Sequence, residues 1–96
     1  MKQAHKMQRQ MEKTQQELAE LTFSASAGGG AVKAIVTGDL RLDELEINPD
    51  IVDLDDMEML QDLIIAATNQ ALSDASKVAD ERMNAITGGM NIPGLF

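Results

Sequence analysis

The chain has 96 residues, no cysteine, a net charge of −8 and only two aromatic residues. A chain of this length forms one small domain near the lower limit of what buries a sufficient core alone, so association with a second copy would supply the missing burial. Without cysteine, a disulfide framework, a thiol nucleophile and a thiolate metal site are excluded. Its apolar runs are too short to cross a membrane, and we expect a soluble cytoplasmic protein.

The charges are distributed unevenly along the chain. Residues 39–62 hold ten acids and one base, Arg41, whereas the first eleven residues hold Lys2, Lys6 and Arg9 and no acid. An acidic segment of this kind is commonly a solvated surface, and we assign it no further role.

Residues 2–21 predict a first helix, because they lack Gly and Pro and are rich in strong helix formers. Apolar positions recur at steps of three and four along one face: Ala4, Met7, Met11, Thr14, Leu18 and Leu21. Bases recur at the same steps on the opposite side: Lys2, Lys6, Arg9 and Lys13. This basic row either faces an anionic partner or is a solvated helix face in which Lys13 pairs with a neighbouring glutamate.

Three short strands are predicted over residues 22–27, 31–37 and 40–47. The triple glycine at 28–30 predicts a hairpin turn rather than a phosphate-binding loop, because a strand follows it instead of a helix. The third strand carries four large aliphatic residues: Leu40, Leu42, Leu45 and Ile47. Their alternation slips by one position, and a β-bulge near Asp43 and Glu44 would bring all four to one face.

A long second helix is predicted over residues 55–86, with Asp55 and Glu58 as a start resembling a capping box. Its apolar face, which we assign to the core or a dimer contact, is Met57, Leu60, Ile64, Ala67, Ala71 and Val78. The helix would be about 48 Å long, so roughly a third of it would overhang a compact domain of this size. We therefore expect a second copy to cover it. The glycines and proline of residues 88–96 predict irregular structure. The apolar residues of this tail are suited to docking on another part of the protein.

No catalytic or metal constellation is present in the sequence. His5 is the only histidine, so one chain offers no His pair and no His-containing triad. The aspartates near residue 53 lack the spacing of a calcium loop. We expect no enzymatic activity, no cofactor, no metal and no small-molecule substrate.

Two binding functions remain open at this point. The basic row of the first helix would contact DNA phosphates, with little sequence specificity because no base-reading motif is present. Alternatively, the apolar surfaces would make the protein an acidic adaptor between other proteins, with little or no affinity for DNA.

Four stretches of the chain are distinctive: MKQAHKMQRQMEKTQQELAEL, AGGGAVKAIVTGDLRLDELEINPDIVD, EMLQDLIIAATNQALSDASKVADERM and TGGMNIPGLF. The block MLQDLIIAATNQAL and the GG-x₃-PG ending are the most specific. Together they resemble, essentially from end to end, the YbaB/EbfC family of bacterial nucleoid-associated proteins.

This resemblance implies a single α+β domain over residues 1–87, an α-β-β-β-α protomer with a three-stranded antiparallel meander, and a tweezer-like homodimer. It also implies duplex DNA binding at the nucleoid, a role in chromosome organisation or gene regulation, and possible partners among recombination or replication proteins. The positions that match the DNA-contacting regions of the family are Lys2, Lys6, Arg9, Lys13, Lys77 and Arg82.

Overall fold

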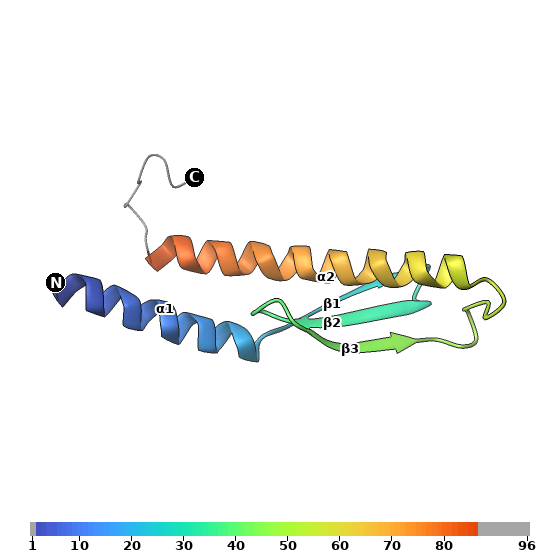
Figure 1. Cartoon of the computed structure of the whole chain (residues 1–96), viewed down its shortest axis with the longest axis horizontal. Coiled ribbons are helices and arrows are strands. Elements are labelled where there is room, and N and C mark those ends of the chain that lie inside the picture. The colour runs from blue at the N-terminus through green and yellow to red at the C-terminus, as the bar shows by residue number, and fades with distance from the viewer. Residues whose placement is uncertain (1, 87–96) are drawn as a thin grey trace.

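The chain forms a helix, three strands and a second, longer helix, in that order (Figure 1). The structure is a computed structural model that describes the backbone of residues 2–86 and the side chains of residues 4–86. Its elements are α1 (Lys2–Glu20), β1 (Thr22–Ala27), β2 (Val32–Thr37), β3 (Leu42–Ile47) and α2 (Met57–Ile86). The strands form one antiparallel sheet in the order β1-β2-β3, which confirms the predicted α-β-β-β-α fold. The predicted tail at 88–96 lies outside the described residues.

The molecule is elongated. Its principal extents are 60 × 27 × 16 Å, and its radius of gyration is 17.7 Å, against about 12–13 Å for a compact domain of this length. The 30 residues of α2 set this length, since they span about 45 Å. One half of α2 covers the sheet and the other half runs beside α1 (Figure 1).

The core lies between α2 and the first two strands. Its fully buried side chains come from β2 and one face of α2: Val32, Ala34, Val36, Ala67, Ala71 and Ala75. Phe23, Ala25 and Ala27 of β1 pack against this set. Because the helix contributes alanines, its backbone packs close to the sheet, and the interface has little room for a larger side chain.

The positions predicted for the core or a dimer contact have different environments. Three are buried in this core: Leu60, Ala67 and Ala71. Ile64 and Val78 are partly buried, and Met57 is exposed. The apolar face of α2 is therefore covered mainly by its own sheet, with α1 beside its far end. The sheet and α1 therefore supply much of the cover that was expected from a second copy, and the dimer itself stays a prediction.

The β3 strand contains the predicted β-bulge. Ile35 pairs with Glu44 whereas the next residue, Val36, pairs with Leu42, so Asp43 is the extra residue. The strand begins two residues later than predicted, because Leu40 has a φ of 65° and completes the turn from β2 instead of extending the ladder. The bulge places Leu42 on the helix-facing side of the sheet, opposite Val36.

The N-terminus of α2 is capped by Asp56, not by Asp55 as predicted. The backbone N–H of Met59 donates to Asp56 Oδ1 at 3.1 Å, the contact expected between an N-cap residue and the third helical residue. Asp53 Oδ1 accepts from the N–H of Asp55 at 2.9 Å, which holds Asp55 in the preceding turn. The local sequence offers three aspartates within four positions, and only the turn geometry selects the capping one.

This cap gives a testable prediction. Changing Asp56 to Ala should lower the free energy of unfolding by about 1 kcal/mol, because it removes the acceptor for the Met59 N–H. Chemical denaturation followed by circular dichroism measures the loss. Changing Asp55 to Ala is the matched control and should cost less. An equal loss in the two variants would contradict the assignment of the cap to Asp56.

Candidate nucleic-acid interface

The C-terminal end of α1 is fixed to the turn between β2 and β3. Leu18 is buried, and the N–H of Gly38 donates to the carbonyl oxygen of Leu21 at 3.0 Å. A Cβ atom at position 38 would overlap the Leu18 carbonyl group, so only glycine allows this close approach. The N-terminal turns of α1 instead project beyond the described end of α2 (Figure 1). The helix is therefore anchored at one end and accessible at the other.

The basic row lies on the accessible part of α1. Lys6, Arg9 and Lys13 are exposed, whereas Met7 and Met11 on the other side are partly buried. Lys2 begins the helix, but its side chain lies outside the described part of the chain. Within the described side chains, the single ion pair joins Lys33 to Glu46 at 3.9 Å, so the three bases form no ion pair with a described acid. The alternative in which Lys13 pairs with a neighbouring glutamate is not what the structure contains.

The two candidate bases of α2 do not extend this row. Lys77 and Arg82 are both exposed, but they are five positions apart, which places them about 140° from each other around the helix axis. Three acids lie within one helical turn of one or both of them: Asp74, Asp80 and Glu81. These two bases are therefore isolated charges, and the strongest positive surface is on α1.

The aspartate-rich part of the acidic segment lies away from this surface. The loop between β3 and α2, which holds four aspartates, is at the opposite end of the long axis from the N-terminus of α1 (Figure 1). That axis is 60 Å long, several times the Debye length of about 8 Å at physiological salt. The charges of these four aspartates are therefore screened from a partner bound at Lys6 and Arg9, although the chain as a whole is acidic.

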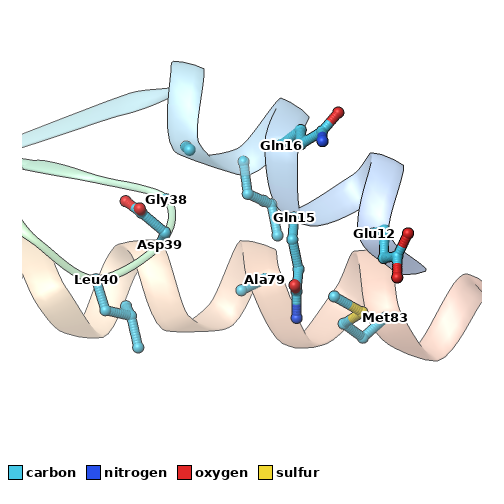
Figure 2. Close-up of a pocket in the computed structure, with 10 residues that line it drawn as sticks. Glu12, Gln15, Gln16, Gly38, Asp39, Leu40, Ala79 and Met83 are labelled. Carbon is cyan, nitrogen blue, oxygen red and sulfur yellow. The ribbon is translucent and has the colours of Figure 1, made fainter. Parts of the chain in front are cut away.

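A groove of about 550 Å³ lies between α1, the β2–β3 turn and α2 (Figure 2). Gln15 points from α1 towards α2, whereas Gln16 points away (Figure 2). The charged residues that line it are Glu12 and Asp39, and no base is among the described lining residues. This groove is therefore unsuited to phosphate and separate from the basic row.

One further surface was not predicted from the sequence. Within the sheet, α2 contacts mainly β1 and β2, so the helix-facing side of β3 is covered only in part: Leu45 packs against the core, but its neighbours on that side do not. Leu42 is 49% exposed and Ile47 is 40% exposed on that side, although both pair with buried residues of β2. The only sequence signal was the bulge, which placed these side chains on the inner face but did not show that the helix leaves them uncovered.

The described part of the chain gives no structural support for two other kinds of site. None of its helices is long and apolar enough to cross a membrane. Residues 4–86 also contain no group of three or more His, Asp or Glu side chains placed to hold a metal ion.

The α+β fold and the unpaired basic row on a projecting helix define a small protein whose surface suits an anionic partner. The chain belongs to the YbaB/EbfC DNA-binding family, whose model matches residues 1–90. It is 54% identical over 95 residues to a nucleoid-associated protein from Thermoanaerobacter pseudethanolicus, covering 99% of this chain and 86% of the relative. It is 55% identical over 96 residues to a nucleoid-associated protein from Clostridium novyi, covering 100% of this chain and 84% of the relative.

A solved structure supports the fold separately. An uncharacterized protein from Helicobacter pylori aligns with a TM-score of 0.67 over 91% of this chain and 96% of its own, at 21% sequence identity. At that identity the likeness concerns the arrangement of helices and strands alone.

Proposed function

We propose that this protein binds duplex DNA as a homodimer, mainly through phosphate contacts and with little sequence specificity. Its role would be chromosome organisation or gene regulation at the nucleoid, without catalytic activity. The observation that carries the proposal is the row of Lys6, Arg9 and Lys13, exposed and unpaired among the described residues on the projecting helix. Family membership and the nucleoid-associated relatives support the same class of partner.

The geometry of the row suits a phosphate backbone. Lys6 and Lys13 are seven residues apart, or about 10 Å along the helix. Duplex DNA presents one negative charge per about 1.7 Å of its axis, so three long basic side chains over this distance can each reach a phosphate. Two protomers would double the number of contacts. Binding by counterion release favours no base sequence, which accounts for the expected low specificity.

The second part of the proposal is a dimer contact through the open face of β3. Leu42 and Ile47 are on this face, and Ile65 of α2 is 56% exposed. Ile65 lies on the same helix stripe as Leu72 and Ala79, and Ala79 lines the groove beside Leu40 of the β2–β3 turn. These side chains would be removed from water by the same surface of a second copy, leaving both α1 helices to project as the arms of the tweezer.

The dimer contact predicts a change of oligomeric state. Changing Leu42 and Ile47 together to Asp should give a folded monomer at micromolar concentration, because four like charges would be buried between two protomers. Sedimentation equilibrium measures the mass. The matched control changes Thr22 and Ser24, both exposed on the outer face of β1, to Asp, and it should remain a dimer. A Leu42/Ile47 variant that stays dimeric would contradict this interface.

DNA binding itself is tested by gel retardation of one random and one defined duplex at about 50 mM salt, where phosphate contacts are strong. We expect both duplexes to be retarded at similar protein concentrations. Absence of any shift would favour the alternative, an acidic adaptor for other proteins, and recombination or replication proteins are the partners to test in that case.

A further inference from the structure

A second, smaller hollow lies at the far end of the molecule from the N-terminus of α1. Its volume is about 200 Å³, and it is enclosed by the β1–β2 turn, the loop before α2 and the first turns of α2. Its walls include the aliphatic side chains of Ile51, Met59 and Leu63. The charged groups among its described lining residues are the carboxylates of Asp53 and Asp56. It is therefore an apolar hollow with a negative rim.

The two rim carboxylates are held in position by the backbone. Asp56 Oδ1 accepts from the N–H of Met59 at 3.1 Å, and Asp53 Oδ1 accepts from the N–H of Asp55 at 2.9 Å. Each of these bonds uses one oxygen of the carboxylate. Neither Asp53 nor Asp56 has an ion pair among the described residues, so the charges of the rim are available to a cation from another molecule.

The surface around the hollow is also apolar and acidic. Ile51, Leu54, Met57 and Met59 are each more than half exposed. Residues 42–76 contain no Lys, Arg or His, so no base of this segment neutralises the neighbouring acids. Exposed aliphatic side chains concentrated in one short segment are characteristic of surfaces that bind a partner.

We propose that this hollow is a docking site for a partner protein that presents a lysine or arginine flanked by aliphatic residues. The methylene stem of such a side chain would lie against Ile51 and Met59, and its charged group would reach Asp53 and Asp56. The flanking aliphatic residues of the partner would cover Leu54 and Met57. A hollow of about 200 Å³ is below the range of about 300–1,000 Å³ for small-molecule sites, which favours a single side chain as the anchor.

Other classes of ligand fit the hollow less well. Phosphates would be repelled by both rim carboxylates, so DNA does not bind at this end. Two carboxylates alone are a poor cation cage, and the described residues contain no cluster of three metal-ligating side chains. The elements that form the hollow lie at the opposite end of the long axis from the N-terminus of α1, so this protein partner and DNA would bind at the same time (Figure 1).

The test uses fluorescence anisotropy at low salt with a labelled peptide of Arg-Leu-Ser repeats. A peptide of Arg-Ser-Ser repeats has the same charge density without the aliphatic residues. We expect wild type to bind the first peptide more tightly than the second. Changing Asp53 and Asp56 together to Asn should weaken binding of the first peptide about tenfold. Asparagine keeps the oxygen that accepts each backbone N–H, so the loop and the helix cap are preserved.

Two further variants distinguish binding in the hollow from nonspecific attraction between the acidic protein and a basic peptide. Changing Ile51 to Ser removes part of the apolar wall at an exposed position and should also weaken binding. Changing Asp43 to Asn together with Glu44 to Gln removes the same amount of charge from β3 and should leave the affinity unchanged.

Several results would overturn the proposal. They are no binding of the Arg-Leu-Ser peptide, equal binding of the two peptides, or equal losses in the rim and β3 variants. A shift of the rim variant from dimer to monomer in sedimentation would show that a second copy occupies the hollow, which also excludes a separate partner. DNA retardation is measured on the same variants and should not change. A failure of the docking proposal can therefore be told apart from a failure of the DNA-binding proposal.

Discussion

The Lys6→Glu/Arg9→Glu double variant should lose the retardation of duplex DNA while remaining a folded homodimer. Each protomer loses two phosphate contacts and gains two charges that repel phosphate, and a dimer doubles both effects. We expect the affinity to fall by at least about 100-fold at low salt. Gel retardation measures the loss, and circular dichroism and sedimentation establish that fold and dimer are kept. Both side chains are exposed, so the change should have little effect on stability.

The control for this variant is Lys33→Glu/Arg41→Glu, which changes the net charge by the same amount. Lys33 and Arg41 are exposed on the sheet and its turn, away from the projecting end of α1. If DNA binding depends on the position of the basic row, this control should keep most of its affinity. Equal losses of DNA affinity in the two double variants would mean that net charge alone governs binding. The assignment of the DNA interface to α1 would then be wrong.

Changing Ala71 to Leu should produce the largest loss of stability. Ala71 has no exposed surface and lies in the core between α2 and the sheet. A leucine there has to displace the helix or adopt a strained rotamer, so the free energy of unfolding should fall by about 2–3 kcal/mol. Urea denaturation at fixed protein concentration measures this change, because a dimer makes apparent stability depend on concentration.

Ala66 provides the matched control on the same helix. It is exposed, and leucine is as acceptable as alanine in a solvated helix, so Ala66→Leu should change stability by no more than about 0.5 kcal/mol. Similar losses at the two positions would contradict the close packing of α2 on the sheet.

Much of the fold could be predicted from local patterns. Three sequence patterns each predicted one structure. The three-and-four spacing predicted the two helices, the triple glycine predicted the turn between β1 and β2, and the slipped alternation predicted the bulge in β3. Boundaries were less predictable, because they depend on individual backbone angles. The left-handed conformation of Leu40 delays β3, and the turn held by Asp53 selects Asp56 as the cap.

The candidate interface was only partly predictable. Helical periodicity alone places Lys6, Arg9 and Lys13 on one face, but whether nearby glutamates pair with them depends on side-chain positions. The surface that covers the apolar face of α2 also could not be predicted from the sequence. An apolar helix face can pack on its own sheet or on a second copy, and nothing in its spacing distinguishes the two. The structure assigns most of that face to the core and leaves β3 open instead.

The most direct test of DNA binding through the basic row is the salt dependence of affinity for a random duplex. With Lys6, Arg9 and Lys13 of both protomers on phosphates, the logarithm of the association constant should fall against the logarithm of salt concentration with a slope of about −5. A defined duplex should give the same slope and a similar affinity. A slope near zero, or no binding at about 50 mM salt, would contradict phosphate contact through the α1 helices.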